Sequence, residues 1–171
     1  MTPGITVATR RDSALSVHRR ISTGNHRSRS GTLWATGSSV PLEGPMLRQI
    51  ITTPDAPSSP LYSQGVRTGD NVVVSGMVGI DPRTNSLAGA TIQDQTRQAL
   101  RNCQAILTAG GATLDDVVEV GVLLTHSSDF AGLNEEYAHW FSAEPPTRYV
   151  ARLGVDIPDV LVSIRMTAIV G

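Results

Sequence analysis

The sequence predicts an α+β domain in which two helices pack on one face of a mixed β-sheet. Three observations support this fold class: apolar, β-branched runs that end at turn residues, two segments with apolar residues at helical spacing, and the order of these segments. That order is strand, strand, helix, strand, helix, strand, strand. The chain has 171 residues, of which 40% are apolar, and this is enough for one domain with an ordinary core.

The predicted strands are short β-branched runs bounded by turn-forming residues. An extended segment over residues 47–50 begins the domain, and a strand over residues 71–80 ends at the turn pattern Asp81-Pro82-Arg83-Thr84-Asn85. Further strands are predicted over residues 117–124, 148–153 and 161–169.

Two helices are predicted between these strands. The first begins at Thr91 and Asp94, which resemble a capping box, and ends at the Gly110-Gly111 pair. Cys103 lies on the apolar face of this helix, so we interpret it as a small buried hydrophobic residue and not as a reactive thiol. The second helix is predicted over residues 128–141.

The predicted strands carry more apolar surface than one layer of helices hides. The residues concerned are Val72, Val74, Val120, Val122, Val162 and Ile164. We therefore expect the second face of the sheet to be covered by other copies of the chain, which makes the protein a homo-oligomer.

Residues 1–45 differ from the rest of the chain in charge. They carry six Arg against Asp12 and Glu43, a net charge of +4, whereas residues 46–171 carry eight Arg against thirteen acidic residues, a net charge of −5. We expect a basic, disordered extension without a catalytic role. The alternatives are a transit peptide, a twin-arginine signal, a translation start at Met46 and a nucleic-acid-binding arm.

The composition and the absence of certain motifs exclude several kinds of chemistry. All fourteen basic residues are Arg, so no lysine can form a Schiff base with a substrate or with pyridoxal phosphate. The sequence has no HExxH, CxxC, Walker or GxGxxG motif, and we expect neither a metal nor another cofactor. His126 is interpreted as a solvated loop residue. No apolar run approaches the roughly 18 residues of a membrane span, so we expect a cytoplasmic protein with no membrane partner.

Arg148 is the strongest candidate for a functional residue. It follows Pro145, Pro146 and Thr147 and precedes an apolar strand. A guanidinium held at such a rigid position can bind a carboxylate through two parallel hydrogen bonds. The alternative is an ion pair at the surface or at an interface.

Four further residues have a polar group, or lack a side chain, where a ligand could approach. Tyr62 follows a proline-containing loop and can stack on a planar substrate or bind a water molecule. Ser75 and Gly76 interrupt an apolar strand, which indicates either a ligand contact or a simple bulge. Asn134 lies in the helical stripe of Phe130, Asn134, Tyr137 and Phe141, which we interpret as mainly core packing.

Together these motifs resemble those of the Rid family, the YjgF-type reactive-intermediate deaminases, over residues 46–170. The matching segments are Tyr62-Ser63-Gln64-Gly65, Val74-Ser75-Gly76, Asp129-Phe130 through Asn134, Tyr137 and Phe141, and Ala143 to Val150. The resemblance implies that residues 46–171 form a Rid-like domain with a chorismate-mutase-like fold, assembled as a homotrimer with sites between subunits. It also implies hydrolysis of 2-imino or 2-enamine acids to 2-oxo acids and ammonia without a cofactor. Arg148 would bind the substrate carboxylate, and Tyr62 would line the pocket.

The sequence departs from the family pattern at two positions. Met77 follows Ser75-Gly76 where many Rid proteins have Gln, and Arg165 stands where deaminating members often have a Glu that positions the attacking water. An alternative function is therefore binding without catalysis, in which Arg148 and Arg165 hold a small dianionic metabolite together. Another alternative is a specialised pathway enzyme on the same fold. A nucleic-acid partner is not expected, because the domain has no basic-aromatic platform.

Overall fold

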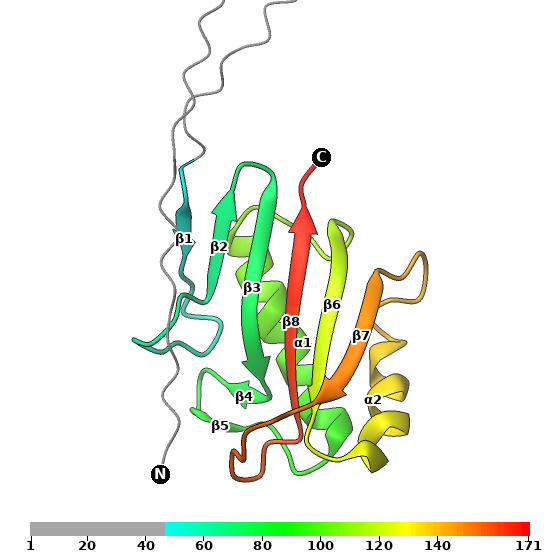
Figure 1. The fold of residues 1–171 in the computed structure, drawn as a ribbon. Coiled ribbons are helices and arrows are strands. Elements are labelled where there is room, and N and C mark those ends of the chain that lie inside the picture. Colours follow the sequence, from blue (N-terminus) through cyan, green and yellow to red (C-terminus); the bar gives the residue numbers. More distant parts are fainter. Residues whose placement is uncertain (1–46) are drawn as a thin grey trace, which may run out of the picture. The chain divides into compact units, whose positions relative to one another are not determined.

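The computed structural model describes residues 47–171, which form a six-stranded mixed sheet with two helices on one of its faces (Figure 1). The predicted α+β class is therefore confirmed. The strand order is β1-β2-β3-β8-β6-β7. The prediction for residues 1–45 and the alternative start at Met46 lie outside the described residues and stay predictions.

The six strands of the main sheet are antiparallel to their neighbours except for β6 and β7, which are parallel. Parallel neighbours need a crossover connection, and α2 supplies it between β6 and β7. The strands are β1 (Gln49–Ile51), β2 (Gly65–Thr68), β3 (Asn71–Val78), β6 (Val117–Leu124), β7 (Thr147–Arg152) and β8 (Val162–Ile169). A separate two-stranded ribbon consists of β4 (Ile80–Asp81) and β5 (Ser86–Leu87).

The long helix α1 (Ile92–Ala109) begins and ends as its sequence predicts. The Thr91 hydroxyl accepts a hydrogen bond from the Asp94 backbone N–H at 3.1 Å, and Gly111 after the helix has a φ of +78°. Its buried face, which includes Cys103, packs on β3 and β8. Burial raises the pKa of the Cys103 thiol, in agreement with an unreactive core residue. No helix among residues 47–171 is long and apolar enough to cross a bilayer.

The second predicted helix, over residues 128–141, is shorter in the structure. A 3-10 turn, η1 (Ser127–Asp129), leads into α2 (Phe130–Tyr137), and hydrogen bonds from Trp140 and Phe141 to the Tyr137 carbonyl close the chain after it. Strands β2, β4 and β5 were not predicted from the sequence. These strands have only two to four residues, too few for alternation of apolar and polar side chains to be recognised.

The expectation that the six aliphatic strand residues need other copies of the chain to cover them was wrong. All six are fully or almost fully buried by α1 and α2 within one chain, because they share the helix-covered face: Val72, Val74, Val120, Val122, Val162 and Ile164. The opposite face, which we call the open face, carries other apolar residues. Val73, Tyr149 and Ile169 lie there with 40–49% of their surface exposed.

Candidate functional site

A groove between α2 and the edge strand β7 contains Arg148. The β7 strand starts where the Thr147 hydroxyl donates a 2.7 Å hydrogen bond to the Val118 carbonyl. Arg148 is the register partner of Val120, whose side chain faces the helices, so Arg148 also points to the helix side of the sheet. Its guanidinium carbon lies 4.6 Å from the ring centre of Tyr137, a cation–π contact. Within residues 47–171, Arg148 makes no ion pair.

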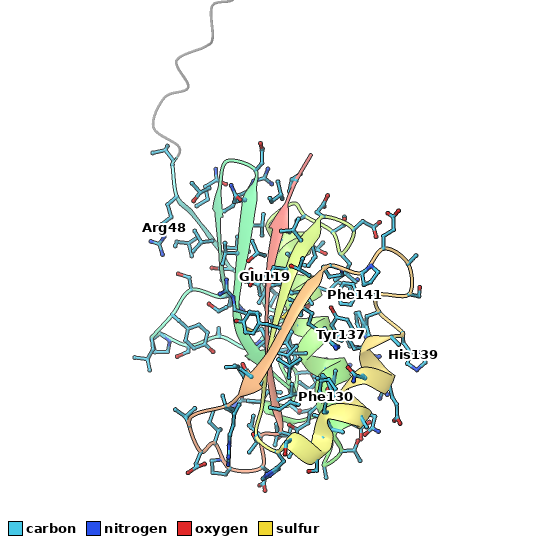
Figure 2. The ribbon with its side chains drawn as sticks, turned by 45° about the vertical axis from the view of Figure 1, so that its right-hand side comes forward. Arg48, Glu119, Phe130, Tyr137, His139 and Phe141 are labelled. Carbon is cyan, nitrogen blue, oxygen red and sulfur yellow. The ribbon has the colours of Figure 1, made fainter. Side chains whose placement is uncertain are left out.

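The aromatic ring of Tyr137 packs against the guanidinium of Arg148. Its ring also contacts Phe141, at 4.7 Å between ring centres, and both residues lie on the α2 side of the molecule (Figure 2). Burial raises the pKa of the Tyr137 phenol, and the nearby charge of Arg148 acts in the opposite direction. The phenol is therefore neutral at physiological pH and able to donate a hydrogen bond.

Two buried polar atoms in this groove lack a hydrogen-bond partner among the described residues. They are the Tyr137 hydroxyl and the Asn134 Oδ1 atom. Buried polar groups are normally hydrogen-bonded, so these two atoms need a partner that residues 47–171 do not supply, such as a water molecule. Asn134, Tyr137, Phe141, Pro146 and Arg148 line this part of the groove as a shallow pocket of about 350 Å³.

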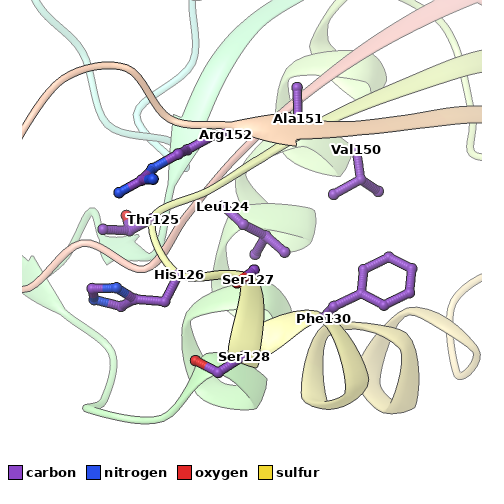
Figure 3. A pocket seen from close by; sticks show the side chains of 9 residues that line it. All are labelled: Leu124, Thr125, His126, Ser127, Ser128, Phe130, Val150, Ala151 and Arg152. Carbon is purple, nitrogen blue, oxygen red and sulfur yellow. The ribbon is translucent and has the colours of Figure 1, made fainter.

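The groove continues along β7 into a larger pocket of about 660 Å³ (Figure 3). Phe130 and Val150 line it on one side, and His126 and Arg152 line it on the other. Phe130 is 46% exposed, so the interpretation of the α2 stripe as mainly core packing is wrong for this residue. Arg152 was not among the predicted site residues, although strand alternation from Arg148 places residues 150 and 152 on the same side. His126 is exposed, as predicted, yet it belongs to the pocket wall.

Tyr62, Ser75 and Gly76 lie on another part of the chain. The Ser75 hydroxyl donates a 2.6 Å hydrogen bond to the Ser63 carbonyl, which ties β3 to the loop that carries Tyr62. The buried side chain of Gln64 braces the same loop with hydrogen bonds to three of its carbonyls. Gly76 lies at an irregularity of the β3–β8 pairing, where a Cβ would come within 2.9 Å of the Ser163 hydroxyl. Tyr62 is 46% exposed.

Arg165 lies on the open face of the sheet. It is the register partner of Gly121, which also pairs with Tyr149, and a Cβ on Gly121 would overlap the Tyr149 hydroxyl. Arg148 and Arg165 therefore point to opposite faces, with β6 between their strands. The suggestion that the two arginines hold one anion together is wrong for a single chain, because β7 and β8, although successive in the sequence, are not neighbours in this sheet.

The predicted site residues thus fall into two sets within one chain. The first set, which we call the groove set, consists of Arg148 and Asn134 with Tyr137 beside them. The second, the β3 set, consists of Tyr62, Ser75 and Gly76, with Arg165 on the neighbouring strand β8. Strands β8 and β6 separate β3 from β7. No three His, Cys, Asp or Glu side chains gather as metal ligands anywhere in residues 47–171.

Comparison with known proteins identifies the family of the chain. A family model described as endoribonuclease L-PSP matches residues 53–170. A RutC family protein of Saccharolobus solfataricus is 41% identical over 124 residues, which cover 71% of this chain and 98% of that protein. A mouse 2-iminobutanoate/2-iminopropanoate deaminase is 36% identical over 104 residues, or 60% of this chain and 77% of the relative.

Solved structures agree with the sequence matches. Escherichia coli TdcF with bound serine has a TM-score of 0.68 and 35% identity, and the similarity covers 72% of this chain and 99% of TdcF. RidA from an Antarctic Psychrobacter species has a TM-score of 0.67 and 36% identity, with 71% and 99% coverage. The chain therefore belongs to the endoribonuclease L-PSP family, the family of the RutC and Rid proteins, as its motifs predicted.

Proposed function

We propose that this protein hydrolyses reactive 2-imino and 2-enamine acids to 2-oxo acids and ammonia. The observation that carries the proposal is the unpaired guanidinium of Arg148, held over the Tyr137 ring beside the unpartnered Asn134 Oδ1 and Tyr137 hydroxyl. Relatives from mouse and from Dermatophagoides farinae are named 2-iminobutanoate/2-iminopropanoate deaminases. The bound serine in TdcF is a small molecule of similar size with a carboxylate.

The reaction needs positioning more than covalent assistance. The guanidinium of Arg148 would bind the substrate carboxylate. An enamine substrate would tautomerise to the imine before it reacts with water. The oxygen of one water molecule then bonds to the imine carbon, the carbon–nitrogen bond breaks, and the nitrogen leaves as ammonia with the two water protons. Asn134 Oδ1 is a hydrogen-bond acceptor suited to orient that water. Such fixed orientation lowers the barrier without a cofactor.

We further propose that copies of the chain assemble as a homotrimer in which the groove set of one copy meets the β3 set of the next. Both sets bear residues that the family motifs assign to the site, yet one chain holds them on opposite sides of β8 and β6. The exposed apolar side chains of the open face support the assembly, since a second copy would remove them from water. A cyclic arrangement repeats the same contact at each interface and completes every site.

The first test is ammonia release from freshly generated 2-iminobutanoate. Replacing Arg148 by Ala is expected to lower kcat/KM about tenfold or more, because a charge-assisted contact to the carboxylate is lost. Arg148→Lys keeps the positive charge but loses the two parallel hydrogen bonds of a guanidinium. Its kcat/KM should therefore lie between those of the wild type and of Arg148→Ala. Arg101→Ala, on the exposed side of α1, is the matched control and should behave like the wild type. Full activity in Arg148→Ala would contradict the assignment.

Arg165 favours a second candidate function, the binding of a small anionic metabolite without catalysis. A permanent cation occupies the position where a water-positioning carboxylate was expected, and it makes no ion pair with another residue of the described chain. If wild-type protein releases no ammonia faster than buffer while Arg165→Glu does, the binding function is supported. Fast release by the wild type would show that Arg165 is compatible with hydrolysis.

A further inference from the structure

The helix-facing side of β7 carries a second cation in addition to Arg148. Residues 148, 150 and 152 project to the same side of the strand because side chains alternate along it. The α-carbons of Arg148 and Arg152 are thus about 13 Å apart. Between them lies Val150, which borders the larger pocket of the groove.

The far end of that pocket has the chemistry of an anion subsite. Arg152 and His126 extend on the same side, away from Phe130 and Val150, as Figure 3 shows. Ser127 and Ser128 also line the pocket and add hydroxyl groups. No acidic side chain lines the pocket, and Arg152 has no ion-pair partner within residues 47–171. An anion at this end would therefore meet donors and one permanent positive charge, with no competing carboxylate.

The other end of that pocket suits a short carbon chain. Phe130 from α2 and Val150 from β7 are apolar side chains that line it there, on the side away from Arg152 and His126 (Figure 3). Long, flexible side chains on α-carbons about 13 Å apart allow each arginine to hold one carboxylate of the same small dicarboxylic acid. A substrate with one carboxylate would leave Arg152 in water.

We propose that Arg152 and His126 bind a second carboxylate at the far end of the substrate, so that the protein prefers short dicarboxylic 2-imino acids over aliphatic ones. This inference rests on the proposed function, in which Arg148 binds the carboxylate next to the imine. It concerns a different end of the groove and different residues. Arg152 is a specificity residue here, since it contacts neither the imine carbon nor the attacking water.

The kinetic test compares ammonia release from freshly generated 2-iminoglutarate and 2-iminobutanoate. Wild-type protein should have the higher kcat/KM for 2-iminoglutarate. The ratio of the two values should fall at least about tenfold in Arg152→Gln, fall less in Arg152→Lys, and stay unchanged in the control Arg101→Gln. An unchanged ratio in Arg152→Gln, or a wild-type preference for 2-iminobutanoate, would overturn the proposal.

A binding test separates this inference from the proposed catalysis. Titration calorimetry with the stable products 2-oxoglutarate and 2-oxobutanoate should give at least about tenfold tighter binding of 2-oxoglutarate, and Arg152→Gln should remove the difference. If ammonia release is never accelerated but this difference is found, the deaminase proposal fails and the subsite stands. If both imines are hydrolysed and the two oxo acids bind equally, the subsite proposal fails alone.

Discussion

At the scale of single residues, the ring of Tyr137 holds the Arg148 guanidinium in place through a cation–π contact. Its ring is buried between Phe141 and the guanidinium, while its hydroxyl is buried without a partner among the described residues. The ring and the hydroxyl therefore contribute differently to stability. A well-packed ring stabilises the fold, whereas a buried hydroxyl without a hydrogen bond contributes little or costs free energy.

Two substitutions of Tyr137 should separate these contributions. Tyr137→Phe is expected to change the free energy of unfolding by less than about 1 kcal/mol, because only the unpartnered hydroxyl is removed. Tyr137→Leu should cost about 2 kcal/mol or more, because the contacts with Phe141 and Arg148 are lost. Urea unfolding followed by circular dichroism measures both. A loss clearly above about 1 kcal/mol in Tyr137→Phe would show that the hydroxyl has a partner after all.

At the scale of elements, the contact between α1 and the end of β3 positions the loop that follows β7. A Cβ on Gly79 would lie 2.7 Å from the Gln95 α-carbon, so the chain and the helix approach too closely for any side chain. Gln95 is fully buried, donates to the Asp159 carbonyl at 2.8 Å and accepts from the Leu161 N–H at 2.9 Å. The position of α1 against the end of β3 thus determines the path of the chain between β7 and β8.

Gly79→Ala is therefore expected to destabilise the domain by about 1–3 kcal/mol, because helix backbone and not a movable side chain blocks the added methyl group. Gly154→Ala is the matched control, since nothing lies within 4 Å of a Cβ at that position. Thermal or urea unfolding of the two variants should show a clear loss for the first and almost none for the second. Equal stability of both would mean that α1 is free to shift.

At the scale of the whole molecule, the proposed homotrimer would bring the groove set of one copy to the β3 set of the next. The open face supports this with exposed Val73, Tyr149 and Ile169. If each site combines Arg148 from one copy with Tyr62 from the next, two inactive variants can complement each other. Separate sites within single chains cannot do so.

Arg148→Ala and Tyr62→Ala should each be poorly active alone and regain activity when they are unfolded and refolded together. In a random equal mixture, about one site in four combines an intact Arg148 with an intact Tyr62. Ammonia release should therefore recover to about a quarter of the wild-type value, and light scattering should give the mass of a trimer. The control is a mixture of Arg148→Ala and Arg148→Gln refolded together. Ammonia release should not recover there, because no site contains an intact Arg148. Absence of recovery in the first mixture would contradict a site shared between copies.

Local patterns in the sequence were sufficient to predict much of the fold. The Thr91 cap, the Gly110-Gly111 stop and the buried Cys103 all agree with the structure, as do the strands over residues 71–80, 117–124, 148–153 and 161–169 within a few residues. Such patterns depend on neighbours a few residues away, which the sequence displays directly. The short strands β2, β4 and β5 were missed because two to four residues are too few to show an alternation of apolar and polar side chains.

Local sequence patterns were enough to predict the fold class, most of the elements, the family and the prominence of Arg148. Which side chains share a surface depends instead on the three-dimensional arrangement of the strands. The last strand, β8, lies between β3 and β6, and the registers of β6 with β7 and β8 place Arg148 and Arg165 on opposite faces. In the same arrangement, Arg152 and His126 line one pocket. Strand order and register come from long-range pairing, and a shift of one residue would turn every side chain of a strand to the other face.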